Sequence, residues 1–152
     1  MKLPTPHPAA LTGEALARDC RLRRTRRTGP GGQHRNKVET AVVVIHLPTG
    51  LCGAAGERRS QAENRARAVF RLRVNLALEV RCPRAPSAAP SSRWAARVRG
   101  GQIFVSPTHE EFPALLAEAL DVLQACASDV KAAARCLAVT PSQLVRFLQR
   151  EP

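Results

Sequence analysis

The chain has 152 residues, of which 44% are hydrophobic, so it can form one domain or one small domain with an appendage. Its net charge of +12 favours a polyanionic partner, because each Lys or Arg placed near a phosphate releases condensed counterions. An aromatic content of 3% argues against a protein that stacks bases on aromatic platforms.

The charge is distributed unevenly along the sequence. Residues 1–84 contain 17 Lys and Arg against 6 Asp and Glu, whereas residues 100–152 contain 4 against 6. We therefore expect a nucleic-acid-binding face in the first half of the chain.

The N-terminal region begins with a short lead. Residues 1–10 are rich in proline and are expected to be disordered. Residues 11–20 predict a short helix that is capped by Thr12. The arginine-rich residues 21–27 are compatible with a strand at an exposed sheet edge.

The next segment predicts a β-hairpin. Residues 41–47 (AVVVIHL) are mostly β-branched and indicate a buried strand. Pro48, Thr49 and Gly50 are turn residues, and residues 51–55 are expected to return as a second strand.

The longest predicted helix begins at Ser60, which stands three residues before Glu63 at capping-box spacing, and it extends to about Val80. Arg67 and Arg71 are expected to face solvent or RNA. The opposite stripe should pack against the sheet: Ala62, Ala66, Val69, Leu72, Leu76 and Val80.

The second half predicts a linker followed by helices. Residues 83–99 include a Pro/Ala/Ser-rich stretch and indicate a linker. Residues 100–152 then predict a small helical segment with helices near residues 112–124 and 128–137 and a third that Thr140 caps.

Residues 130–150 resemble a helix-turn-helix, which leaves a DNA-binding function open. Ala138 occupies the usual position of the turn glycine, and the second helix offers Arg146 and Arg150 as its cations. A packing module, or a module that binds a protein partner, is the favoured alternative.

The tripeptide Gly-Gly-Gln occurs twice. Residues 29–37 read GPGGQHRNK, behind a basic run, whereas residues 100–102 precede a strand-like segment and predict a turn. Glycines let the backbone approach a ligand closely, and a glutamine amide can orient a water but cannot deprotonate it. The first copy can therefore position a water against an activated ester, or it can be an ordinary phosphate-binding turn.

Three blocks in order resemble the catalytic region of class I peptide chain release factors and their small codon-independent ribosome-rescue relatives. They are residues 28–37, residues 41–50 and residues 57–65 (ERRSQAENR). The resemblance covers about residues 20–81. It implies an α+β fold in which a short β-sheet is packed by a long helix, followed by a linker and a small α-helical segment.

The resemblance also implies the site residues. Gly31, Gly32 and Gln33 would be catalytic in hydrolysis of the peptidyl-tRNA ester, with Pro30, His34 and Asn36 bracing the loop. Basic residues would contact RNA: Arg26, Arg27, Arg35, Lys37, Arg58, Arg59, Arg65, Arg67 and Arg71.

The expected organisation is a lead at 1–10, a GGQ catalytic domain at 11–82, a linker at 83–99 and a helical segment at 100–152. The 152 residues leave no room for codon-reading domains, so we expect codon-independent release. A catalytically idle RNA-binding module is the alternative.

The expected partners are large-subunit ribosomal RNA and peptidyl-tRNA, with a protein partner as a candidate for the C-terminal helices. The five scattered cysteines form no C-x-x-C pair, so no metal or other cofactor is expected, and reduced thiols fit a cytoplasmic protein. No apolar run approaches membrane-spanning length, so no membrane association is expected.

Overall fold

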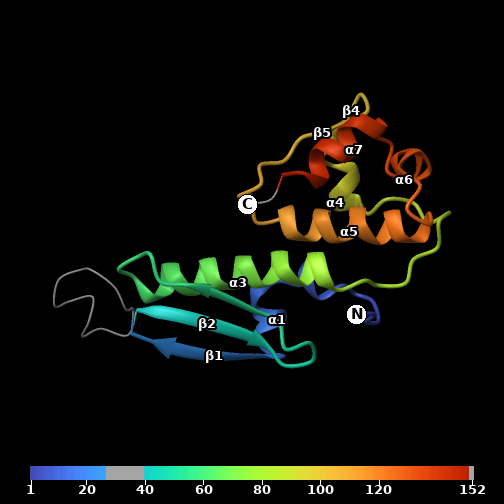
Figure 1. Ribbon diagram of the computed structural model, residues 1–152. Coiled ribbons are helices and arrows are strands. Elements are labelled where there is room, and N and C mark those ends of the chain that lie inside the picture. The colour runs from blue at the N-terminus through green and yellow to red at the C-terminus, as the bar shows by residue number, and fades with distance from the viewer. Residues whose placement is uncertain (27–39, 151–152) are drawn as a thin grey trace. The chain divides into compact units, whose positions relative to one another are not determined.

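The computed structural model describes residues 1–26 and 40–150 (Figure 1). Its contacts divide the chain into two compact units. The sheet unit is Leu11–Leu76, and the helical unit combines Met1–Ala10 with Ala77–Pro152. A short antiparallel sheet together with several helices confirms the predicted α+β class.

The sheet unit is built on three antiparallel strands in the order β1-β2-β3. Strand β1 is Cys20–Thr25, β2 is Ala41–His46 and β3 is Cys52–Ala55. Every second residue of β2 is buried, so its β-branched run forms a half-buried central strand. The sheet confirms the predicted hairpin and the exposed edge strand.

Helix α3, Gln61–Glu79, lies along one face of this sheet (Figure 1). Ser60 caps it, as predicted, because its Oγ accepts a hydrogen bond from the Glu63 N–H at 3.3 Å. Gly53 of β3 makes the close packing achievable: an added Cβ would collide with the backbone carbonyl oxygen of Ala68 and the backbone nitrogen of Leu72.

The buried face of α3 differs from the predicted stripe at its first turns. Leu72 and Leu76 are fully buried, but Ala62 and Ala66 are exposed. The first inward-facing residue is instead the polar Asn64, followed one turn later by Ala68. A pattern based on hydrophobicity alone does not include a buried amide.

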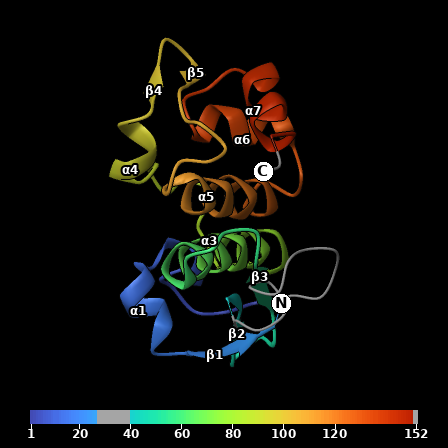
Figure 2. The same ribbon diagram turned by 90° about the vertical axis from the view of Figure 1, so that its left-hand side faces the viewer.

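The helical unit contains three longer helices, two short ones and a small hairpin (Figure 2). Helices α5, α6 and α7 contact one another, and α7 also contacts β5. The bounds are η1 Pro8–Ala10, α4 Ser92–Ala95, β4 Val98–Arg99, β5 Gln102–Ile103, α5 Phe112–Ala125, α6 Val130–Cys136 and α7 Pro141–Leu148.

An aromatic cluster forms the core of the helical unit. Trp94 and Phe147 stack edge to face, and Phe112 packs on Phe147, with centroid distances of 5.5 Å in both pairs. The indole N–H of Trp94 donates a hydrogen bond to the Leu137 carbonyl at 2.8 Å. The linker prediction for residues 83–99 is therefore wrong for its second half, which contributes α4, β4 and the buried Trp94.

Residues 1–10 are ordered rather than a disordered lead. The Leu3 N–H donates to the Arg81 carbonyl at 3.0 Å, and the Arg81 N–H donates to the Met1 carbonyl at 2.8 Å. His7 and Ala9 are buried. Within this segment Pro8–Ala10 form the short helix η1, and the residues before it pair with the chain that follows α3.

The second Gly-Gly-Gln is a turn, as predicted. Gly100 and Gly101 have φ values of 55° and 75° between the paired residues Arg99 and Gln102. Two left-handed residues are what a two-residue hairpin turn requires, and glycine adopts them without a steric cost. In the turn between α6 and α7, Ala138 also has a positive φ of 55°.

Candidate functional site

The expected catalytic loop joins the ends of two paired strands. Thr25, the last residue of β1, pairs with Ala41, the first residue of β2. The segment 27–39 therefore leaves and re-enters the described structure at one end of this strand pair. The expected site residues within it lie outside the described residues: Arg27, Pro30, Gly31, Gly32, Gln33, His34, Arg35, Asn36 and Lys37.

Asn64 ties together the two backbone segments beside that segment. Its side chain is fully buried, and its Nδ2 donates to the carbonyls of Thr40, at 2.7 Å, and Arg58, at 2.8 Å. Its Oδ1 accepts from the Arg58 N–H at 3.0 Å. One amide thus fixes the residue before β2 against the turn before α3. In the sequence, Asn64 stands out only as part of the block at residues 57–65 that carries the family resemblance.

Glu57 organises the other end of that turn. Its Oε1 lies 3.1 Å from Nη1 of Arg67 and 2.7 Å from Nη2 of Arg71, and Arg71 also donates to the Ala54 carbonyl at 2.7 Å. Arg67 and Arg71 are exposed, as predicted, but both carry an acidic partner. They therefore brace the turn as well as presenting charge.

The pKa of Glu57 reflects this arrangement. Desolvation opposes its ionisation, but hydrogen bonds from the backbone N–H groups of Gly56 and Glu57 and from Arg71, with the charge of Arg71, outweigh it. Together they lower the pKa to about 2. The carboxylate is thus ionised at neutral pH.

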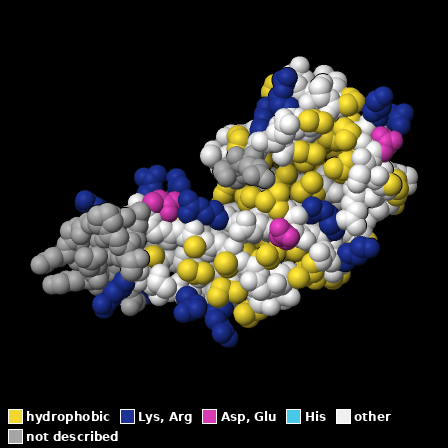
Figure 3. Space-filling model, in the orientation of Figure 1, with side chains coloured by type: hydrophobic (Ala, Val, Ile, Leu, Met, Phe, Trp, Pro, Cys, Tyr) yellow, Lys and Arg dark blue, Asp and Glu magenta, His cyan; other side chains and the backbone are white. Residues whose placement is uncertain are grey.

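Further basic side chains surround this corner of the sheet unit. Arg58, Arg59 and Arg65 are exposed, as is Arg26 at the end of β1. Strand β1 adds three exposed arginines that were not among the expected RNA contacts: Arg21, Arg23 and Arg24. Their clustering within one short edge strand was the available signal. Figure 3 shows basic side chains at several separate places along the sheet unit.

Two buried histidines have structural partners. His46 Nδ1 lies 2.8 Å from Thr49 Oγ1 in the β2–β3 turn, and burial lowers its pKa. His7, Cys82 and Asp121 place their ligand-type atoms within 4.8 Å of one another in the helical unit. However, both ring nitrogens of His7 contact backbone groups, at 3.0 and 3.1 Å, and Asp121 accepts from the Cys82 N–H at 2.9 Å. This cluster is a hydrogen-bond network that ties residues 1–10 to α5.

Comparison with known proteins agrees with the motif blocks. The family model of the RF-1 domain matches residues 14–103. Peptide chain release factor 1 of Acidiphilium cryptum is 46% identical over 71 residues, which cover 47% of this chain and 20% of that protein. Peptide chain release factor 2 of Paramagnetospirillum magneticum is 48% identical over 58 residues, 38% of this chain and 16% of that protein.

An organellar relative gives a similar match. The mitochondrial peptide chain release factor 1-like protein of Mus musculus is 38% identical over 71 residues, 47% of this chain and 19% of that protein. The chain spans a fifth or less of the length of these three relatives. Because the family model covers more than half of the chain, the protein belongs to the RF-1 domain family.

No helix within residues 1–26 and 40–150 has the length and apolar character needed to cross a bilayer.

Proposed function

We propose that this protein hydrolyses the peptidyl-tRNA ester on the ribosome, independently of a codon, and so releases peptides from stalled complexes. Its membership of the RF-1 domain family, together with the complete Gly31-Gly32-Gln33 motif, is the observation that carries the proposal. The relatives named above are release factors, which fits this reaction class.

The proposed chemistry requires positioning rather than a side-chain nucleophile. A water attacks the ester carbonyl carbon, the bond to the ribose oxygen breaks, and the products are a free peptide carboxyl group and a tRNA hydroxyl group. Gly31 and Gly32 allow the backbone to reach the ester, and the Gln33 amide N–H stabilises the developing negative charge. The Gln33 side chain shapes the water pocket.

The described residues support this proposal because they hold the chain at one end of the expected catalytic loop. Asn64 fixes Thr40, the residue that immediately follows the segment 27–39, and thereby restricts where that segment re-enters the sheet. Arg26, Arg58, Arg59 and Arg65 of the sheet unit are exposed and would face ribosomal RNA phosphates. Arg67 and Arg71 would add charge while they hold the turn through Glu57.

The test is peptide release by the purified protein from ribosomes stalled on an mRNA without a stop codon. The same assay on a stop-codon complex tests codon independence, because a codon-independent enzyme should not require the stop codon. Release that depends on a stop codon would contradict the rescue part of the proposal and leave the hydrolysis part in place.

A pair of matched glycine substitutions tests the motif assignment. Gly32→Ala should reduce release by roughly a hundredfold or more, because a Cβ blocks the close approach, whereas ribosome binding should persist. Gly100→Ala changes the first glycine of the second motif, where the added Cβ has open space although the φ of 55° strains an alanine, and release should remain within a few-fold of the parent. A Gly32→Ala protein that releases peptide as fast as the parent would contradict the assignment of this motif. A parent protein that binds ribosomes without releasing peptide would favour the catalytically idle RNA-binding module.

A further inference from the structure

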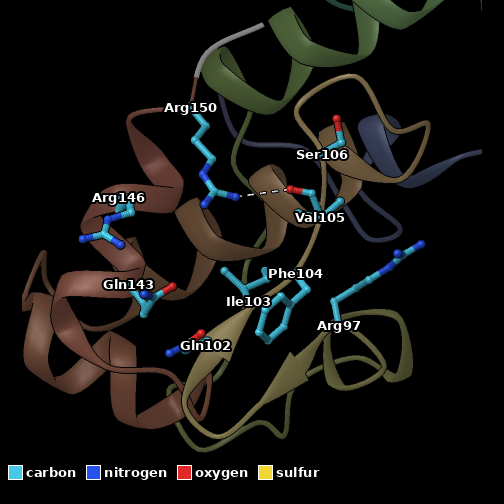
Figure 4. Close-up of a pocket in the computed structure, with 9 residues that line it drawn as sticks. All are labelled: Arg97, Gln102, Ile103, Phe104, Val105, Ser106, Gln143, Arg146 and Arg150. Carbon is cyan, nitrogen blue, oxygen red and sulfur yellow. Dashed lines mark hydrogen bonds between the residues drawn. The ribbon is translucent and has the colours of Figure 1, made fainter.

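The helical unit contains a solvent-accessible pocket of about 430 Å³ between the β4–β5 hairpin and α7 (Figure 4). Arg97 comes from the segment before β4, Gln102 and Phe104 come from β5 and the residue after it, and α7 supplies Gln143 and Arg146. Arg150, which follows α7, completes the wall. Residues about 50 positions apart in sequence therefore line one site.

The arginines of this pocket differ in their partners. Arg97 is held by Glu111, with Nη2 2.6 Å from Oε2, so its charge is largely matched. Arg150 donates to the Val105 carbonyl at 3.2 Å, which positions its guanidinium without neutralising it. Arg146 is exposed, and neither it nor Arg150 has an acidic partner among residues 1–26 and 40–150. The pocket therefore presents two uncompensated positive charges to an anion.

The remaining lining groups are those that accept an unstacked base. Phe104 is 55% exposed, although large aromatic side chains are normally covered. The side-chain amides of Gln102 and Gln143, which line the same pocket, each provide hydrogen-bond donors and an acceptor. A planar apolar surface next to amides and guanidinium groups matches the stacking, base-edge hydrogen bonding and phosphate contacts of single-stranded RNA.

We propose that this pocket binds a short single-stranded RNA segment, with one base on Phe104 and phosphates at Arg146 and Arg150. An acidic peptide would use the two arginines but would leave the exposed phenylalanine and the two amides without a role. The proposal is separate from ester hydrolysis, because none of these residues belongs to the expected catalytic loop.

The first experiment places a fluorescent reporter in the pocket of the full-length chain. In a Phe104→Trp variant, a single-stranded oligouridylate should quench the introduced indole in a saturable manner, because a stacked base contacts it. Val145→Trp is the matched control, since Val145 is exposed on α7 but does not line the pocket. RNA that binds elsewhere in the chain would leave the pocket reporter unchanged, and this result would overturn the proposal.

The second experiment changes charge in the reporter variant. Arg146→Glu should raise the RNA concentration at half-quenching by roughly fivefold or more and lower the salt slope by about one. Arg135→Glu makes the same change at an exposed position of α6 outside the pocket, and it should shift the RNA concentration at half-quenching by less than about twofold. Equal shifts for both variants would contradict the proposal, as would equal quenching by an oligoglutamate peptide, which would assign the pocket to an acidic protein.

Discussion

The sheet unit has a larger excess of basic over acidic residues than the helical unit has. The sheet unit contains 14 Lys and Arg against 5 Asp and Glu, and the helical unit contains 10 against 7. In the helical unit Glu111 is paired with Arg93 and Arg97, and Glu118 is paired with Arg84. The comparison teaches that location matters more than net charge: in the part of the chain that the structure describes, three of the eight arginines of the helical unit are paired with an acidic residue, and two of the others, Arg146 and Arg150, line one pocket.

The two units also form their cores by different means. The sheet unit brings a helix close to the sheet through Gly53, whereas the helical unit fills its centre with Trp94, Phe112 and Phe147. If the cores are energetically separate, a core substitution in one unit should leave the other protected from amide hydrogen exchange. The following predictions test that separation.

The largest expected effect is that of Trp94→Ala. It removes a fully buried indole, its hydrogen bond to Leu137 and its contact with Phe147, and should lower the free energy of unfolding of the helical unit by about 3–5 kcal/mol. Hydrogen exchange should accelerate in α5 and α7 but not in β2. Phe104→Ala is the control, because that exposed ring should contribute little to stability. Equal acceleration in β2 would show that the two cores unfold together.

Gly53→Ala should destabilise the sheet unit rather than the helical unit. The added Cβ meets backbone atoms of α3 rather than a side chain that can move, so the sheet unit should lose roughly 3 kcal/mol of unfolding free energy. Gly50→Ala provides the comparison, because that site has a positive φ of 74° but open space, and it should cost only about 1 kcal/mol. Denaturant unfolding followed by circular dichroism measures both. Similar losses would contradict a specific collision with α3, because Gly53, unlike Gly50, is not a positive-φ glycine.

Asn64→Ala should cost about 2 kcal/mol, because it leaves the carbonyls of Thr40 and Arg58 without their buried donor. Hydrogen exchange at Ala41 and Val42 should accelerate more than at Ile45. If the proposed function holds, peptide release should fall further than stability predicts, since the re-entry point of the loop loosens. Unchanged exchange at the start of β2 would contradict the anchoring role.

The smallest expected effect is that of Glu57→Gln, about 1 kcal/mol at pH 7, because the ion pairs are partly exposed. The folded-state pKa of Glu57 is lowered to about 2, so the stabilisation is fully present above the ordinary value of 4.5 and is lost as the pH falls towards 2. The stability difference between parent and variant should therefore shrink across this interval in denaturant titrations. A constant difference would show that Glu57 acts through shape rather than charge.

The sequence predicted elements whose causes are local. Thr12, Ser60 and Thr140 cap their helices as expected, and the alternating burial of β2 follows from its β-branched run. Gly100 and Gly101 form the expected turn. Each of these features depends on neighbouring residues, so short-range patterns suffice.

The features that the sequence did not predict depend on contacts between distant residues. The composition of residues 83–99 indicates a linker, but Trp94 is buried by helices that follow it. The net charge of residues 100–152 does not reveal the pocket, because Arg97 lies before that segment and Arg146 and Arg150 lie near its end. Glu57 lies before α3, whereas its ion-pair partners Arg67 and Arg71 lie inside that helix. The expected catalytic residues of segment 27–39 remain predictions.

The pairing of residues 1–3 with Arg81 has a consequence for folding during synthesis. Residues 1–10 leave the ribosome before residues 77–82 exist, so this early segment must wait while the whole of Leu11–Leu76 is made. The sheet unit can complete its local contacts in that interval, whereas the helical unit needs residues from both sides of the sheet unit in the sequence. A segment that is made early and whose pairing partner is delayed is exposed to competing pairings, and the prolines at positions 4, 6 and 8, which cannot donate backbone hydrogen bonds, limit that competition.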